Sequence, residues 1–245
     1  MNRSILKWII FIIISLLVLY SIYWLIVSSQ FKSQVNSLLQ DRNDINYQSI
    51  SVSGFPYRMN MQIDNLESDN NLFQIRIKKL FFDLNPFDLE KVMMRTPELE
   101  GELIIEKEKL NFLINNLVTR IDFKEHNIEN IRLISESIKT KYIATKIVEF
   151  NKVKFYLIGN DLKSYDIEIN SIANTNFYSK DETIIIEVAG NIKSVDNELY
   201  GDMQLDILKE TSKDRIFSLP LTINNGVLSA LFIPILDFRK FLYDF

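Results

Sequence analysis

The residue types that most enzymes use for nucleophilic, acid–base or metal chemistry are scarce in this chain. It contains no cysteine and a single histidine, His126, which lies in a polar run at residues 124–127. A cysteine nucleophile, a disulfide framework, a thiolate zinc site and any site with two imidazoles are therefore excluded. We interpret His126 as a solvated turn residue. Serine, lysine and acidic residues are plentiful, but their spacing singles out no catalytic pair and no metal site.

Glycine spacing and net charge exclude two further classes of protein. The six glycines stand apart from one another, so neither of the glycine-rich loops that cradle nucleotide phosphates can be built. The net charge is −4 and the pI about 5.2, which is not the basic footprint of a nucleic-acid-binding protein. We therefore expect no enzymatic activity, no cofactor, no bound metal and no nucleic-acid partner.

An uninterrupted apolar run at residues 8–27 determines the class of protein. It carries no charged side chain, and its polar residues are two serines and the aromatic tips of tyrosine and tryptophan. At about 1.5 Å per residue, a helix of this length spans roughly 30 Å, the thickness of a bilayer core. The run predicts a transmembrane helix, whose apolar and interfacial anchor residues include Trp8, Phe11, Leu16, Leu19, Tyr23, Trp24 and Val27.

A cleaved signal peptide is the alternative interpretation of this run. The run is longer than the apolar region of a signal peptide, roughly 7–15 residues, and Ser28-Ser29-Gln30 after it matches a cleavage site poorly. Arg3 and Lys7 precede it without an acid, which predicts a cytoplasmic N-terminus. We expect a single-pass inner-membrane protein. Residues 1–30 form the cytoplasmic stub and anchor, and residues 31–245 form a periplasmic β-rich domain, either undivided or in two β halves that meet near residue 125.

Beyond residue 41, apolar and polar residues alternate with the period of two that half-buried strands require. Such alternation favours an antiparallel sheet with one wet face. We predict a mainly β fold, in which the transmembrane helix is followed by an elongated, curved antiparallel sheet, a half-open barrel or groove, with one or two short helices. The alternating segments are residues 57–64, 73–78, 99–105, 153–157, 165–170 and 199–207.

Three segments have helical patterns. Residues 31–40 continue the anchor as an amphipathic helix, with apolar residues near one face. Asn85 and Pro86 provide the capping chemistry that commonly starts a helix, which predicts one over residues 89–94. Residues 131–147 fit a helix through Ile131, Ile134 and Ile138, but their β-branched residues fit a strand almost equally well.

A short motif follows the anchor. Residues 51–59 read SVSGFPYRM and contain the element Gly54, Phe55, Pro56, Tyr57 and Arg58. This resembles the domain of unknown function 2125 family, bacterial envelope proteins with a membrane segment, a G-F-P-Y-R element and a β-rich region. The strand–turn–strand pattern at residues 219–227 is similar to the closing strands of that family and, more loosely, to AsmA-like envelope proteins linked to lipid traffic. The resemblance implies no catalytic residues.

Two interpretations of the motif remain open at this stage. In the first, Gly54 and Pro56 form a structural corner that starts the sheet. In the second, Tyr57 and Arg58 contact a lipid headgroup or a protein partner.

The aromatic content and the apolar C-terminal segment suggest what the β domain does. The chain has 17 phenylalanines and 10 tyrosines, which either fill a core or line an open apolar groove able to bury acyl chains. We expect a non-enzymatic protein that binds or guides a lipid or another apolar envelope component, with the bilayer as its first partner. The alternative is an assembly protein that binds another envelope protein through a sheet edge or residues 235–245. A hydrolase is the third hypothesis. No ligand-binding residues and no oligomeric state are predicted.

Overall fold

The computed structural model describes residues 3–55, 58–70, 73–85, 87–105, 108–125, 127–142, 146–161, 163–178, 180–195, 198–231 and 233–237. The predicted fold class is confirmed, because one long N-terminal helix, α1 (Arg3–Gln40), precedes a single open sheet of 14 strands. The strands are β1 (Ile45–Asn46), β2 (Ser49–Ser53), β3 (Met59–Asp69), β4 (Phe73–Asn85), β5 (Asp88–Ile105), β6 (Glu108–Lys124), β7 (Asn127–Tyr142), β8 (Lys146–Asp161), β9 (Ser164–Tyr178), β10 (Lys180–Val195), β11 (Glu198–Lys209), β12 (Arg215–Asn224), β13 (Val227–Ala230) and β14 (Ile233–Asp237).

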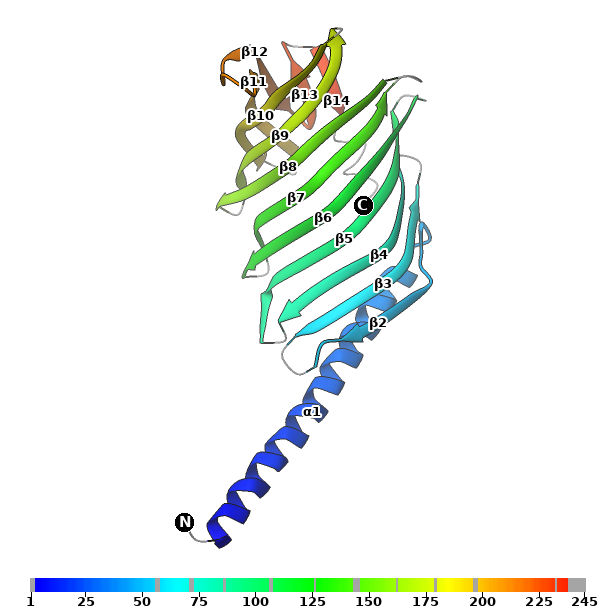
Figure 1. Ribbon diagram of the computed structural model, residues 1–245, viewed down its shortest axis with the longest axis vertical. Coiled ribbons are helices and arrows are strands. Elements are labelled where there is room, and N and C mark those ends of the chain that lie inside the picture. Colours follow the sequence, from blue (N-terminus) through cyan, green and yellow to red (C-terminus); the bar gives the residue numbers. More distant parts are fainter. Residues whose placement is uncertain are drawn as a thin grey trace.

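The sheet is an antiparallel meander. From β3 to β14 each strand pairs with the next strand in the chain, and β1 and β2 both pair with β3 at the first edge. Figure 1 shows α1 at the lower end of the molecule and the strands rising above it one after another, with the more distant β10 to β14 behind β8 and β9 at the upper end. At roughly 4.8 Å between neighbouring strands, the path across the sheet from β3 to β13 is on the order of 50 Å.

The C-terminal third of α1 packs onto the first strands of the sheet. This confirms that residues 31–40 continue the anchor as an amphipathic helix, since their apolar side chains meet the sheet. The core cluster consists of Ile50, Met61 and Ile63, and Phe31, Val35, Leu39, Leu80 and Phe82 pack against it.

The helix predicted over residues 89–94 is wrong, because these residues belong to β5. The capping chemistry is present but serves a turn, in which Asn85 Oδ1 accepts a hydrogen bond from the backbone N–H of Phe87 at 3.0 Å. Val92 and Met94 then pair with Leu84 and Phe82 of β4. The Asn-Pro capping pattern is common to turns and to helix starts, and here cross-strand pairing decides in favour of a turn between two strands.

For residues 131–147 the strand alternative is correct as far as Tyr142, where β7 ends. Ile134, which the helical pattern had placed beside Ile131 and Ile138, is 44% exposed. Residues 143–145 lie outside the described residues, and Lys146 begins β8.

Six consecutive strands share an interruption of their alternation. In each of β3 to β8, two successive residues point away from the side of the sheet on which α1 packs, and the alternation then resumes in the opposite phase. The pairs are Asp64-Asn65, Lys78-Lys79, Pro97-Glu98, Asn115-Asn116, Glu136-Ser137 and Asn151-Lys152. Because of these pairs, both halves of each strand direct their apolar residues to the same side.

The backbone at these pairs is distorted in a coordinated way. Asn65, Asn116 and Lys152 have positive φ angles of 49°, 49° and 53°, a conformation that asparagine tolerates better than most residues. The strand pairing is interrupted beside them, for example where Pro97 lies opposite Asn116. A proline is acceptable in a central strand only at such a break. Local irregularities of this kind bend strands and increase their twist, in keeping with the curvature in Figure 1.

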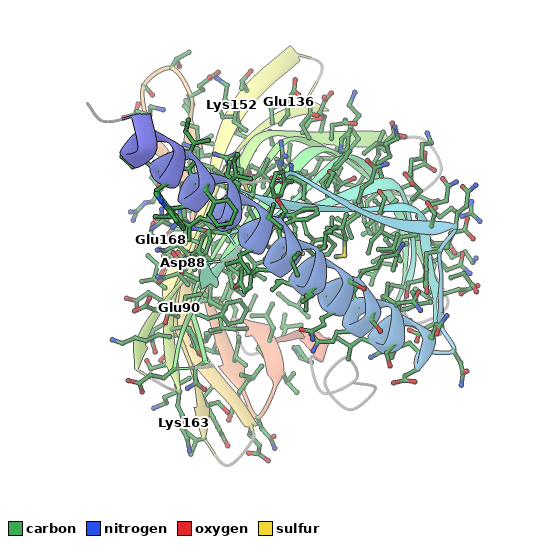
Figure 2. The ribbon with its side chains drawn as sticks, turned by 90° about the horizontal axis from the view of Figure 1, so that it is seen from below. Asp88, Glu90, Glu136, Lys152, Lys163 and Glu168 are labelled. Carbon is green, nitrogen blue, oxygen red and sulfur yellow. The ribbon has the colours of Figure 1, made fainter. Side chains whose placement is uncertain are left out.

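We call the side of the sheet on which α1 packs the inner face. Figure 2 shows the strands as an arc seen from below, with Glu136, Lys152 and Glu168 at its outer margin. From β3 to β13 the inner face comprises Met59, Met61, Ile63, Leu66, Ser68, Phe73, Ile75, Ile77, Leu80, Phe82, Leu84, Val92, Met94, Thr96, Leu99, Gly101, Leu103, Leu110, Phe112, Ile114, Leu117, Thr119, Ile121, Phe123, Ile131, Leu133, Ser135, Ile138, Thr140, Val148, Phe150, Val153, Phe155, Leu157, Tyr165, Ile167, Ile169, Ser171, Ala173, Ile184, Ile186, Val188, Gly190, Ile192, Leu199, Gly201, Met203, Leu205, Ile207, Phe217, Leu219, Leu221, Ile223, Leu228 and Ala230.

Candidate functional site

The inner face is apolar along its whole length. The residues named above carry no charge, and their few polar members are serines, threonines and one tyrosine, while exposed charged residues lie in phase with them at the margins of the face, at Glu90 on β5 and Lys209 on β11. Most of its large side chains are half-buried, which reflects packing against their neighbours within a single layer. Beyond α1, no described element packs extensively on this face. An apolar surface of this extent is unusual for a soluble domain.

Side-chain hydroxyl groups donate hydrogen bonds to backbone carbonyl oxygens where the strands bend. Ser135 is fully buried, and its Oγ lies 2.8 Å from the carbonyl oxygen of Asn115 and 3.0 Å from that of Ser137. Thr96 Oγ1 donates in the same way to the carbonyl oxygen of Glu98 at 2.9 Å. Carbonyl groups near the interrupted pairing therefore have local donors, and the small polar residues on the inner face have a structural role.

The charged residues lie on the opposite side of the sheet and pair with one another across strands. Lys78 Nζ lies 2.7 Å from Glu98 Oε1, and Lys139 Nζ lies 3.4 Å from Glu149 Oε1. The hydrogen bond with Glu98 raises the pKa of Lys78. A hollow of about 530 Å³ is lined by acidic and basic side chains, among them Arg76, Glu98 and Lys139, together with Gly101 and Phe112. Among the described residues, no group of acids or histidine could hold a metal ion.

The predicted anchor residues lie on the exposed surface of α1, as lipid-facing residues would. Trp8, Phe11, Leu16 and Leu19 are each at least 60% exposed. Ser21, within the run, donates its hydroxyl to the helix carbonyl of Leu17 at 2.8 Å, and Ser28, directly after the run, donates its hydroxyl to that of Leu25 at 3.1 Å, so both hydroxyls have partners on the helix backbone. Tyr23 and Trp24 have additional contacts, and Val27 is half-buried beside the packed end of the helix.

Five aromatic rings join the anchor to two turns of the sheet. We call Tyr20, Tyr23, Trp24, Phe55 and Phe87 the aromatic cluster. Trp24 meets Phe55 edge to face with ring centroids 5.6 Å apart, and Tyr20 stacks on Phe87 at 6.0 Å. Tyr20 also contacts Phe55 at 5.9 Å, and Tyr23 contacts Phe87 at 6.4 Å. The cluster therefore connects three segments that are far apart in the sequence.

The motif turn supplies one of these rings. Gly54 has a φ of +101°, and a Cβ atom there would lie 2.7 Å from the carbonyl oxygen of Arg58. The turn is closed by a hydrogen bond from the backbone N–H of Arg58 to the carbonyl oxygen of Gly54 at 3.0 Å. Pro56 and Tyr57, like His126, lie outside the described residues. The chain thus requires glycine at residue 54 to bring Phe55 against α1.

Charged side chains surround the same end of the sheet. Arg58 is exposed, and it lines a hollow of about 340 Å³ together with Asp83, Lys91 and Arg120. The hydrogen bond from Lys91 Nζ to Asp88 Oδ2, 3.0 Å long, lowers the pKa of Asp88 and raises that of Lys91. The sheet therefore presents aromatic rings and cations together beside the anchor.

Two parts of this arrangement were missed in the sequence. Phe87 was assigned to a helix start, although it lies in the β4–β5 turn and packs on Tyr20. The continuous inner face was also missed, because the alternating segments had been considered one by one. The pairs of adjacent polar residues that interrupt the alternation, such as Asn115-Asn116, were the available signal.

The fold and these surfaces define a class of protein: an open, curved antiparallel sheet with an apolar inner face, joined to an N-terminal helix long and apolar enough to cross a membrane. Comparison with protein-family models, with curated proteins and with solved structures found no match to this chain.

Proposed function

We propose that this protein is anchored in the inner membrane by α1 and that its inner face binds or guides the acyl chains of a lipid, without catalysing a reaction. The observation that supports this most directly is the uncharged, half-buried inner face that extends from β3 to β13. Acyl chains bury apolar surface, at roughly 25 cal/mol per Å², against such side chains. A polar solute would find no specific partner on this face.

The location is part of the proposal. Arg3 and Lys7 support a cytoplasmic N-terminus by the positive-inside rule, and with one membrane crossing the sheet would then lie in the periplasm. The resemblance of the GFPYR element to the domain of unknown function 2125 family supports an envelope protein in the same way. A reporter enzyme that is active only outside the cytoplasm, fused after Phe245, tests the orientation. Activity of a cytoplasmic reporter at that position would contradict it.

Photo-crosslinking at pairs of adjacent residues, one on the inner face and one on the outer side, tests lipid binding. Ile169 belongs to the inner face, whereas Glu168 beside it is exposed on the outer side (Figure 2). We expect a benzophenone amino acid at residue 169 of the full-length protein to crosslink to phospholipid in cells, as detected by mass spectrometry, and the same amino acid at residue 168 to give none. Residues 188 and 187 repeat the pair on β10, because Val188 is an inner-face residue and Glu187 is exposed. Equal lipid adducts at inner and outer positions, or none at either, would contradict the proposal.

The alternative is an assembly protein, and one observation favours it. Among the described residues, β14 is the last strand and forms an edge of the sheet, and its Ile233 and Ile235 are 68% and 56% exposed. An exposed apolar edge strand is a template for strand addition by another chain. Removal of residues 235–245 would then abolish capture of a protein partner and leave the lipid adducts at residue 169 unchanged.

A further inference from the structure

We propose that the aromatic cluster seats the lower end of the sheet in the lipid interface, so that the inner face beyond the strands that α1 covers opens onto the membrane leaflet from which α1 emerges. This deepens the proposed function, because it rests on α1 spanning a bilayer. It assigns a membrane-contact role to Phe55 and Phe87, which no pattern in the sequence indicated.

The first step is the position at which α1 leaves the membrane. Ser28 is buried, at 7% exposed, and from Phe31 onwards the apolar side of α1 packs against the sheet. The helix therefore contacts protein after about residue 28, so lipid can surround it only before that point. A span that begins at Trp8, directly after Lys7, reaches roughly 25 Å at Trp24 and roughly 30 Å at Val27. The bilayer boundary thus falls between Trp24 and Val27, directly beside the aromatic cluster.

The second step is that the sheet touches α1 at this same level. Tyr20, Tyr23 and Trp24 are in ring contact with Phe55 or Phe87. A turn that contacts the helix at the membrane boundary must itself lie at that boundary. Tyrosine and tryptophan are the residues enriched at this depth.

The third step is the exposure of the two phenylalanines. Phe55 remains 48% exposed and Phe87 67% exposed in spite of their contacts with α1. Exposed phenylalanine at the tips of two turns is unfavourable in water but is stabilised by burial among the upper parts of acyl chains. Arg58, in the same turn as Phe55, is exposed and places a cation at the level of lipid phosphates.

The net charge of the chain is negative, so charge attraction does not account for this contact. The anchor and the aromatic side chains account for the contact instead. A phospholipid leaflet is the partner that suits them, because it offers both acyl chains and a polar interface. Val92, a half-buried inner-face residue that pairs with Leu84 just beyond the Phe87 turn, would then face lipid entering from the leaflet.

Depth-dependent quenching tests the contact, and the absence of cysteine makes single-cysteine probes straightforward. The full chain carrying Phe87→Cys, labelled with an environment-sensitive fluorophore, is reconstituted in phosphatidylethanolamine–phosphatidylglycerol vesicles. These contain lipids that are spin-labelled on the headgroup, high on the acyl chain or at the chain end. We expect fluorescence to be lost with headgroup and upper-chain labels and to change little with chain-end labels.

Two controls make the outcomes distinct. Leu16→Cys, in the middle of the apolar run, reports whether α1 spans the bilayer, and Ser212→Cys, in the exposed turn between β11 and β12, reports the far end of the sheet. Quenching at residue 16 without quenching at residue 87 would overturn this inference and leave the anchor intact. No quenching at residue 16 would overturn the anchor and the inference together. Phe55→Cys carries the same test if Phe87→Cys lowers the melting temperature of the protein.

Discussion

The hydroxyl of Ser135 on β7 lies 2.8 Å from the backbone carbonyl oxygen of Asn115 on β6, at the point where the pairing of these two strands is interrupted. Ser135 has no solvent exposure. This small polar residue on a largely apolar face supplies a hydrogen-bond donor to a carbonyl group near the interruption of the strand pairing. The bend depends on local hydrogen bonds of this kind to backbone groups. Because of the bend, the apolar residues in both halves of the strand point in the same direction.

Ser135→Ala is expected to destabilise the fold by about 1–3 kcal/mol, because a buried acceptor loses its donor. Ser135→Val should cost at least as much, since it adds volume without supplying a donor. Urea unfolding of the full-length protein in detergent, followed by circular dichroism, measures both. Thr222→Ala, at an exposed position of β12, is the matched hydroxyl deletion and should change the free energy of unfolding by less than about 0.5 kcal/mol. Equal effects at residues 135 and 222 would contradict this role.

Gly101 and Phe112 should be energetically coupled. They pair directly across β5 and β6, and a Cβ atom on Gly101 would lie 2.1 Å from the Phe112 ring. Gly101→Val is expected to cost about 1–3 kcal/mol through overpacking. The same substitution in the Phe112→Ala protein should cost clearly less, because the ring that it displaces is absent. A double-mutant cycle from thermal unfolding measures the coupling, and strictly additive effects would argue against this ring contact.

Gly54→Ala should disturb the turn that carries Phe55. The φ of +101° and the 2.7 Å approach to the carbonyl oxygen of Arg58 both oppose a side chain at this position. We expect a loss of about 1–3 kcal/mol in stability and weaker quenching of a label at residue 55 by upper-chain spin labels. Ser53→Ala, one residue earlier at an exposed position, is the control. Unchanged stability and quenching in Gly54→Ala would show that the turn tolerates a Cβ atom.

The ion pair beside Phe87 predicts a weak dependence on acid pH. Lys91 lowers the pKa of Asp88 in the folded protein, so the stabilisation is present above the pKa of the unfolded chain and is lost as the pH falls through the folded pKa. Asp88→Asn should therefore reduce stability slightly at neutral pH and leave it unchanged at pH values below both pKa values. Melting temperatures of the two proteins from neutral to acid pH measure this. A difference that grew as the pH fell would have the wrong sign.

The strand segments could be predicted because the period of two is a property of the local backbone. Residues 73–78 and 153–157 alternate within β4 and β8, where the structure places them. The predicted segments were too short, because the alternation reverses at Lys78-Lys79 and at Asn151-Lys152. Each reversal was taken as the end of a strand, although the strand continues through a local bend.

The apolar N-terminal helix, the mainly β content and the lack of thiol and paired-imidazole chemistry could be predicted from the amino-acid sequence. They follow from composition and from periodicities within about ten residues of chain. Three features became visible only in the folded chain: the reversals align across β3 to β8, the apolar residues form one inner face, and Phe55 and Phe87 meet Tyr20. Such features depend on the register between strands and on contacts between distant segments, which the free energy of the whole sheet selects and no local pattern specifies.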